Sequence, residues 1–227
     1  GECQASPPEN ASDDFDAKLL FNWGDDPAGP GPGYFYDTLN TSMTNSELST
    51  DFGNAAEAAD FNNDGKIDIM ACNTLGANIV EIFYNEGSTP GTDFNSDVVY
   101  VGAPYHFKVD DLDGDADLDF IIIDDSQDRY AINTGNGSDG RANFTTYVIG
   151  DSLSEFGNTP SCFDLDNDGD LDCFVADVDA DLPSFCPSTG RRSHLYENTG
   201  VISQLFVENT LPIPSSELSA SFDIAPV

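Results

Sequence analysis

The sequence is poor in basic residues. Lysine and arginine total 7, against 42 aspartates and glutamates, which gives a formal net charge of −35 at pH 7. A nucleic-acid partner is not expected, because binding requires lysine and arginine to displace the counterions of the phosphates. The same charge disfavours an anionic membrane surface. We therefore expect a strongly acidic, well-hydrated surface.

Long apolar runs are also missing. No stretch of about 18 apolar residues occurs, so no membrane insertion is expected. The first residues, Gly-Glu-Cys-Gln, lack the basic start and apolar stretch of a signal peptide, which indicates a processed chain or a piece of a longer one. Apolar residues nevertheless make up 39% of the chain, with 16 Phe and 8 Tyr, which predicts a folded core.

Signatures of common enzymes are absent from the sequence. It contains no HExxH, GxSxG or P-loop motif. His106 and His194 stand apart, and an isolated histidine beside aromatic strand residues usually has a structural role. A pair of catalytic carboxylates among the 42 acidic residues remains an open alternative. We therefore predict that the chain is not an enzyme.

The five cysteines form no CxxC pair, so a zinc site is not expected. Cys162 and Cys173 flank an acidic segment, and this placement is compatible with a cross-strand disulfide or with two buried thiols. Cys186 could pair with Cys3 or with Cys173. Because the count is odd, one thiol stays free or pairs outside this chain.

What the chain has instead is an acidic segment repeated three times at intervals of 51 and 53 residues. The copies are Asp60-Phe-Asn-Asn-Asp-Gly-Lys-Ile-Asp68, Asp111-Leu-Asp-Gly-Asp-Ala-Asp-Leu-Asp119 and Asp164-Leu-Asp-Asn-Asp-Gly-Asp-Leu-Asp172. We call them the first, second and third acidic loops. Each has carboxylate or amide oxygens at positions 1, 3, 5 and 9. One such segment would fit a solvated surface, but three copies in register favour ion binding.

Calcium is the ion that this spacing suits, since it takes about 6–8 oxygen ligands in a flexible shell. The sequence predicts about three calcium ions. The predicted side-chain ligands are Asp60, Asn62, Asp64 and Asp68; Asp111, Asp113, Asp115 and Asp119; and Asp164, Asp166, Asp168 and Asp172. Position 7 is expected to offer a backbone carbonyl, from Lys66, Asp117 and Asp170. Position 6 favours a residue that tolerates positive φ, which suits the glycines of the first and third loops better than Ala116.

The loops are not EF-hands. An EF-hand needs a bidentate glutamate at position 12 and a helix on each side. Position 12 is Ala71, Ile122 or Val175 here, and the residues after each loop form short runs rich in β-branched or aromatic side chains. Such runs predict strands.

Further short sequence motifs repeat at fixed positions before and after the acidic loops. Phe52-Gly53 and Phe156-Gly157 precede the first and third loops, and Val101-Gly102-Ala103-Pro104 precedes the second. An apolar strand ending in Asn-x-Gly recurs at Asn22, Asn85, Asn133 and Asn198. Glycine-containing turns after apolar strands indicate hairpins. The unit therefore has about four strands in about 50 to 65 residues, the size of a propeller blade.

With these motifs, residues 17–227 resemble the FG-GAP (VCBS-type) calcium-binding β-propeller repeats. The resemblance implies an all-β fold, a β-propeller of four-stranded antiparallel blades. We expect a leader or linker at 1–16, a partial blade at 17–57, and blades with calcium loops at 58–109, 110–162 and 163–227, the last with an insertion at 177–192. Because residues 222–227 resemble the approach to another loop, the ring is expected to be completed by the rest of a longer propeller or by other protein chains, with pairing of its own termini as the alternative.

The resemblance implies an extracellular or cell-surface module for adhesion, recognition or assembly of a surface structure, with calcium rigidifying the blades. The N-x-S/T sequons at Asn10, Asn40, Asn136 and Asn143 fit a secretory route. One alternative is the non-catalytic propeller of a polysaccharide-active enzyme. Another is a lectin that binds glycans, with stacking residues among Trp23, Tyr34, Tyr36, Tyr105 and Tyr147, although such aromatic residues more often form the core between blades.

Overall fold

The computed structural model describes residues 20–22, 35–37, 53–73, 77–87, 94–124, 126–150, 157–177 and 193–209. These residues form 14 strands and one short 3-10 helix, Ile202–Gln204. Within these ranges, no helix is long and apolar enough to cross a membrane. The predicted all-β class is confirmed.

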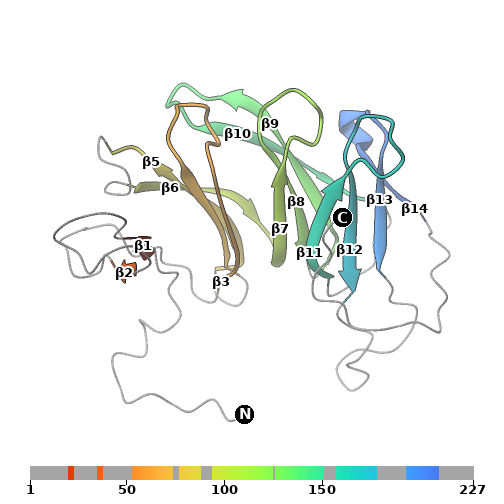
Figure 1. Cartoon of the computed structure of the whole chain (residues 1–227), viewed down its shortest axis with the longest axis horizontal. Helices are drawn as coiled ribbons and strands as arrows, with labels where there is room; N and C mark the ends of the chain where they lie inside the picture. The colour runs from red at the N-terminus through yellow and green to blue at the C-terminus, as the bar shows by residue number, and fades with distance from the viewer. Residues whose placement is uncertain are drawn as a thin grey trace, which may run out of the picture.

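The strands form three four-stranded antiparallel sheets, each in chain order, which stand side by side without closing into a ring within the described part (Figure 1). The first sheet contains β3 (Gly53–Ala59), β4 (Asp68–Asn73), β5 (Ile79–Asn85) and β6 (Phe94–Val101). The second contains β7 (Pro104–Asp110), β8 (Asp119–Asp124), β9 (Arg129–Asn136) and β10 (Ala142–Val148). The third contains β11 (Gly157–Phe163), β12 (Asp172–Asp177), β13 (His194–Asn198) and β14 (Phe206–Asn209). A separate pair joins β1 (Leu20–Asn22) to β2 (Phe35–Asp37).

Each sheet begins on the strand ahead of its acidic loop. The sheets span 53–101, 104–148 and 157–209, so their first strands precede the expected unit boundaries at 58, 110 and 163. The strand before each loop pairs with the strand after it, which makes the loop a hairpin connection. The expected leader, nearly all of the expected insertion and the segment 222–227 lie outside the described residues.

Two hydrophobic clusters hold the sheets together. The first joins the first and second sheets through residues such as Met70, Ile82, Phe107 and Phe120. The second joins the second and third sheets through residues such as Ile121, Tyr130, Val175, Tyr196 and Phe206. Because successive side chains of a strand point to opposite faces, β8 contributes alternate residues to the two clusters, and all six of its residues are buried. The second sheet is therefore a central layer covered on both faces.

Hydrogen bonds also join the first sheet to the second sheet and the second sheet to the third. The Tyr100 hydroxyl of the first sheet donates to Asp124 Oδ2 of the second at 2.6 Å, and the Tyr196 hydroxyl of the third donates to Asp128 Oδ2 at 2.5 Å. Asp124 Oδ2 also accepts from the Ala103 amide at 2.7 Å. A Cβ at Gly102 would overlap the Tyr100 hydroxyl, so the glycine of the Val-Gly-Ala-Pro segment leaves room for this contact.

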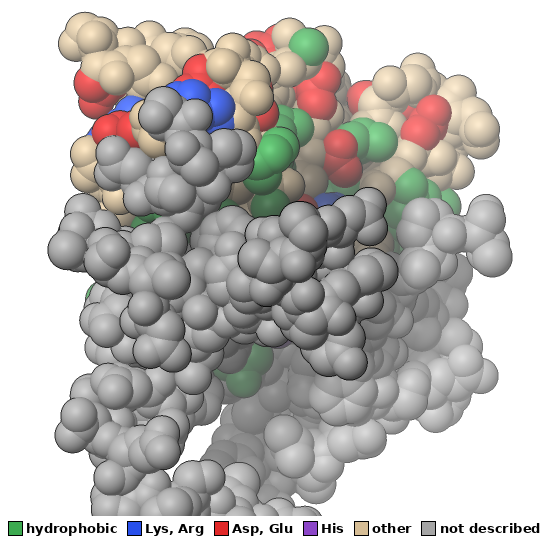
Figure 2. Space-filling view, turned by 60° about the vertical axis from the view of Figure 1, so that its left-hand side comes forward, with side chains coloured by type: hydrophobic (Ala, Val, Ile, Leu, Met, Phe, Trp, Pro, Cys, Tyr) green, Lys and Arg blue, Asp and Glu red, His purple; other side chains and the backbone are tan. Residues whose placement is uncertain are grey.

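The three acidic loops lie on the same edge of the sheets, at the top of the view in Figure 1. Acidic side chains line this edge in the space-filling view of Figure 2. The fold therefore collects the repeated segments at one end of the molecule, where each loop connects the first two strands of its sheet.

Candidate metal centre

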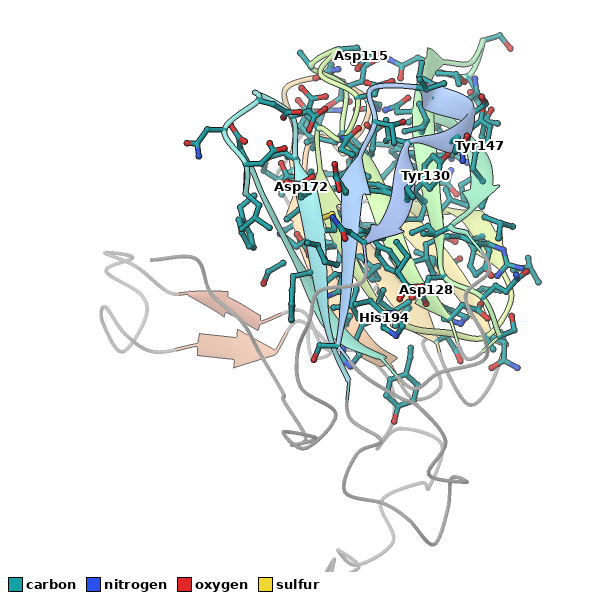
Figure 3. All side chains as sticks on the ribbon, turned by 90° about the vertical axis from the view of Figure 1, so that its right-hand side faces the viewer. Asp115, Asp128, Tyr130, Tyr147, Asp172 and His194 are labelled. Carbon is teal, nitrogen blue, oxygen red and sulfur yellow. A yellow bond between two sulfur atoms is a disulfide. The ribbon has the colours of Figure 1, made fainter. Side chains whose placement is uncertain are left out.

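Positions 1, 3 and 5 converge in the acidic loops. In the second loop, one carboxylate oxygen each from Asp111, Asp113 and Asp115 lie within 4.8 Å of one another. Asp164, Asp166 and Asp168 do the same in the third loop. Three convergent hard oxygens form part of the shell that calcium requires. Figure 3 shows Asp115 near the upper edge of the molecule, where the second loop lies.

The first loop has an amide at position 3. Asp60 Oδ1 and Asn62 Oδ1 both accept from the backbone amide of Asp64, at 3.0 and 3.3 Å, so these two oxygens lie on the same side of the loop, around one donor. Asn62 is fixed from the neighbouring sheet, because its Nδ2 donates to the Gly140 carbonyl at 3.0 Å. The third loop has the same two bonds, in which Asp164 Oδ1 and Asp166 Oδ1 accept from the Asp168 amide, so the first loop shares this backbone arrangement with one carboxylate fewer.

The turn within each loop depends on two residues with positive φ. Position 6 has φ values of 86° at Gly65, 75° at Ala116 and 101° at Gly169. Position 4 also lies in this region, with φ values of 56° at Asn63, 81° at Gly114 and 65° at Asn167. Glycine adopts such values without strain and asparagine tolerates them, whereas alanine does not favour them. The prediction that position 6 needs positive φ is confirmed, and Ala116 adopts it at an energetic cost.

Position 9 differs from positions 1, 3 and 5 because its carboxylate is buried and bound to backbone amides. Asp119 is 0% exposed. Its Oδ2 accepts from the amides of Leu112 and Asp113 at 2.9 and 3.3 Å, and its Oδ1 accepts from the amide of Asn133 at 2.8 Å. Burial raises the pKa of Asp119 to about 7, an effect that these hydrogen bonds oppose.

In the other two loops, the carboxylate at position 9 also accepts from the amide of position 2 and from the amide of the asparagine in the Asn-x-Gly turn. Asp68 accepts from the amides of Phe61 and Asn85 at 3.2 and 2.8 Å, and Asp172 accepts from those of Leu165 and Asn198 at 3.2 and 2.9 Å. Position 9 therefore ties position 2 of its loop to the asparagine of the Asn-x-Gly turn. An ionised carboxylate has about four lone-pair sites, so calcium ligation by Asp68, Asp119 and Asp172 stays a prediction beside this structural role.

Position 7 was expected to contribute a backbone carbonyl, which stays a prediction for Lys66, Asp117 and Asp170. The side chains of Lys66 and Asp117 contact other residues of the loops, and that of Asp170 has a raised pKa. Lys66 Nζ lies 3.4 Å from Asp64 Oδ2, and Asp117 Oδ1 accepts from Asn63 Nδ2 of the first loop at 2.7 Å. Burial, with the hydrogen bond and charge of Asp168, raises the pKa of Asp170 to about 6.

The carboxylates of the loops oppose one another electrostatically. Burial raises the pKa of Asp113, and the charges of Asp115 and Asp111 raise it further. Asp166 is exposed, but local desolvation within the loop and the charge of Asp168 raise its pKa as well. Because like charges within a few ångströms disfavour ionisation of each other, a divalent cation among them would stabilise the ionised form. The donor set therefore fits calcium in both type and charge.

The asparagine of the Asn-x-Gly turn has a second role, between sheets. Asn133 Nδ2 donates to the Leu118 carbonyl of its own loop and to the Phe61 carbonyl of the first loop, at 3.4 and 3.3 Å. Asn198 repeats this pattern toward Leu171 and Leu112, at 3.2 and 2.9 Å. From the sequence these segments were predicted as hairpin turns alone, and the signal that could have revealed more was their fixed spacing after each loop.

A disulfide links Cys162 to Cys173 at the base of the third loop. The two residues are direct partners in the register of β11 and β12, which decides between the disulfide and the pair of thiols. Cys72 is a buried thiol whose Sγ lies 3.6 Å from the Tyr105 carbonyl. Cys3 and Cys186 lie outside the described residues.

The aromatic residues considered for sugar stacking are not gathered in one site within the described residues. Tyr147 stacks on Tyr130 with ring centroids 5.2 Å apart, at the junction of the second and third sheets (Figure 3). Tyr105 contacts the ring of His106. Trp23 and Tyr34, and the side chain of Tyr36, lie outside the description. Tyr147 thus belongs to the core between sheets.

His194 has structural contacts. Its Nδ1 lies 3.1 Å from Glu208 Oε1, and its ring stacks on Tyr196 at the second junction. For His106, burial lowers the pKa.

The comparison with known proteins bears on the repeat. No curated protein matches the chain. Residues 111–175 match the family model described as an FG-GAP-like repeat. The match runs from position 1 of the second acidic loop to β12, just past the third loop, and thus covers one full period of the internal repetition. Residues 111–175 are therefore similar to an FG-GAP-like repeat, and the four-stranded sheets are consistent with the blades of a β-propeller-like module.

Proposed function

We propose that this chain is a non-catalytic, calcium-binding module of the cell exterior, used in adhesion, recognition or assembly of a surface structure. The observation that carries the proposal is the convergence of three carboxylate oxygens in the second loop and three in the third, each set within 4.8 Å. In the first loop, Asp60 Oδ1 and Asn62 Oδ1 accept from the Asp64 amide as the corresponding oxygens of the third loop do from the Asp168 amide. Calcium would hold each loop by these oxygens and remove the repulsion between its carboxylates.

Calcium bound in this way would stabilise the assembly of sheets as well as the loops. Position 2 of a loop contacts its own position 9 through the amide and the next sheet through the carbonyl, as Leu112 does with Asp119 and Asn198. A loop fixed by an ion would thus present a fixed acceptor to its neighbour. Because the ion binds the folded chain and not the unfolded one, binding adds to the free energy of unfolding.

An extracellular location is supported by the disulfide between Cys162 and Cys173, since disulfides persist in oxidising compartments. Loop sites of modest affinity also suit the outside of a cell, where extracellular modules bind calcium with dissociation constants of about 10⁻⁴–10⁻³ M. Among the described residues, the sequon asparagines Asn136 and Asn143 are exposed, as glycosylation requires.

The partners we propose are further blades, supplied by a longer chain or by another protein. Phe61 and Leu112, at position 2 of the first and second loops, are 0% and 1% exposed where the next sheet covers them. Leu165, at position 2 of the third loop, is 44% exposed. The third sheet therefore offers the kind of surface that the other two bury against a neighbour.

The proposal predicts a large effect of chelation on thermal unfolding. Each ion at a free concentration 100 times its dissociation constant adds about 2.7 kcal/mol to the free energy of unfolding. We therefore expect EDTA to lower the melting temperature by many degrees, and added calcium to restore it. The D111N/D113N double variant should lose part of the calcium-dependent rise, whereas Asp97→Asn, an exposed change in β6, should keep it all. A melting curve that EDTA leaves unchanged would contradict the proposal.

A further inference from the structure

The second sheet holds position 3 of the first acidic loop from two sides. Asn136, the last residue of β9, donates from Nδ2 to the Asn62 carbonyl at 2.7 Å, and Asn62 Nδ2 donates back to the Gly140 carbonyl at 3.0 Å. The turn between β9 and β10 thus fixes both the backbone and the side chain of Asn62 (Figure 1). Position 3 of the second loop is Asp113, whose carboxylate cannot donate such a bond in return.

These two bonds act on a predicted calcium ligand. An asparagine can turn either the oxygen or the nitrogen of its amide toward an ion, and only the oxygen can bind calcium. Because Nδ2 of Asn62 is bonded to the Gly140 carbonyl, Oδ1 faces its own loop, where it accepts from the Asp64 amide beside Asp60 Oδ1. The second sheet therefore sets the orientation of the one amide among the predicted side-chain ligands.

A further hydrogen bond joins the first loop to the second loop directly. Asn63, at position 4 of the first loop, donates from Nδ2 to Oδ1 of Asp117, at position 7 of the second, at 2.7 Å. The acceptor is a carboxylate, which makes the bond stronger than one between neutral groups. Asn63 also has a φ of 56°, so it belongs to the turn that gives the loop its shape. The position of Asp117 therefore acts on the turn of the first loop.

The second and third loops cannot be joined in the same way. Position 4 of the second loop is Gly114, which has no side chain to reach position 7 of the third loop. That position is Asp170, and its Oδ1 is buried without a hydrogen-bond partner among the described residues. The direct bond between loops is thus a feature of the first and second loops, and it depends on the asparagine at position 4.

We propose that Asn136 and Asp117 are positioning residues for the calcium site of the first loop, and that calcium in the second loop raises the affinity of the first through Asp117. The inference rests on the proposed calcium binding and deepens it, because it makes the first site a joint product of two sheets. Calcium in the second loop would fix Asp117, whose carbonyl is a predicted ligand and whose side chain holds Asn63. A fixed acceptor lowers the cost of ordering the first loop. By linkage, calcium in the first loop raises the affinity of the second by the same factor.

The first test is a calcium titration of the full chain, followed by the backbone amide NMR signals of Gly65 and Gly169 at position 6 of the first and third loops. Asn136→Ala and Asn63→Gly should each raise the dissociation constant of the first loop by about three- to tenfold, which corresponds to one hydrogen bond. Glycine keeps the positive φ at position 63, so N63G removes the amide and not the turn. The third loop of each variant should keep its dissociation constant, which separates positioning from a general loss of folded protein.

Asn167→Gly is the matched control. It makes the same substitution at position 4 of the third loop, where φ is 65°. N167G should leave the dissociation constant of the first loop unchanged. Hydrogen exchange in EDTA supplies a measurement without the ion. The Gly65 amide, which donates to Asp60 Oδ2 at 2.8 Å, should exchange faster in N136A and in N63G than in N167G, because the first loop is less ordered in the first two variants.

A double-mutant cycle tests the coupling between the loops. The D111N/D113N variant should weaken calcium binding at the first loop, and this effect should be smaller when Asn63 is also replaced by glycine. Removal of two negative charges would by itself weaken the first loop equally with and without Asn63. The difference between the two backgrounds therefore measures the link through Asp117.

Three results overturn the proposal. They are a first-loop dissociation constant that N136A and N63G leave unchanged, Gly65 exchange in EDTA that both leave unchanged, and an equal effect of D111N/D113N in the two backgrounds. In each case the Gly65 and Gly169 signals still respond to calcium, so the proposed function survives. If neither signal responds to calcium, the proposed function fails and this inference fails with it.

Discussion

Asn133 connects two neighbouring sheets through one side-chain amide. Its Nδ2 donates to the Phe61 carbonyl in the first acidic loop at 3.3 Å, while its backbone amide donates to Asp119 of its own loop at 2.8 Å. The asparagine thus contacts two acidic loops at once. Asn198 makes the same pair of contacts one sheet further along, with Leu112 and Asp172. Each loop is therefore fixed both by its own sheet and by the next.

Asn133→Ala tests this connection. We expect it to lower the free energy of unfolding by about 1–3 kcal/mol, because the buried Phe61 carbonyl and the partly buried Leu118 carbonyl lose their donor. Asn85→Ala is the control, since its Nδ2 contacts its own loop alone among the described residues and its Oδ1 is already unpaired. Urea denaturation measures both changes. An equal loss in the two variants would contradict a role between sheets.

Position 9 and position 5 of one loop should respond differently to the same substitution. Asp119→Asn should destabilise the calcium-free chain by about 1–3 kcal/mol, because the buried carboxylate accepts three backbone amides and an asparagine offers one oxygen for them. Asp115→Asn should change the same quantity by less than about 0.5 kcal/mol, since this side chain is exposed. It should instead weaken calcium binding to the second loop. Urea denaturation in EDTA and calorimetric calcium titration separate the two effects, and equal destabilisation would refute the distinction.

Ala116→Gly should stabilise the chain. Alanine at this position has a φ of 75°, where glycine has no steric penalty. We expect the free energy of unfolding to rise by about 0.5–1 kcal/mol in EDTA, measured by urea denaturation. Gly65→Ala, at the same position of the first loop, is the matched reverse change and should destabilise. Stabilisation by G65A would show that the loop does not need positive φ there.

The carboxyl of Asp124, which lies between the first and second sheets, makes the free energy of unfolding depend on pH. Burial raises the pKa of this carboxyl, but hydrogen bonds from Ser126, Tyr100 and Ala103 outweigh burial and hold the pKa below its ordinary value. Because the folded pKa lies below the unfolded one, the stabilisation is complete above about pH 4 and is lost as the pH falls through the folded pKa. Asp124→Asn should therefore cost about 1–3 kcal/mol at neutral pH, and this difference from the unaltered chain should shrink below about pH 4. A constant difference in urea denaturation from pH 7 to pH 3 would rule this out.

The repeat and its strands could be predicted from the sequence because they are encoded locally. The spacing of Asp111, Asp113 and Asp115 predicts convergent oxygens, and the apolar run that starts after Leu118 predicts a strand. The turn residues between such apolar runs predict a repeated unit of four strands. These features need no knowledge of which segments meet in space.

Contacts between sheets could not be predicted in the same way, because they join residues far apart in the sequence. The Asn133 side chain and the Phe61 carbonyl are 72 positions apart, and nothing local marks the carbonyl as an acceptor. The ion pair between Arg141 and Glu86, at 2.8 Å, likewise joins the turn before β10 to the residue after β5. The disulfide of Cys162 was undecided until the register of β11 and β12 placed its partner opposite.

The most direct test of the account is the number of calcium ions bound per chain, measured by equilibrium dialysis and elemental analysis at millimolar calcium. We predict about three ions for the unaltered chain. The D164N/D166N/D168N variant removes the three convergent carboxylates of the third loop and should bind one ion fewer. No bound calcium, or an unchanged count in this variant, would contradict the claim that the acidic loops are calcium sites.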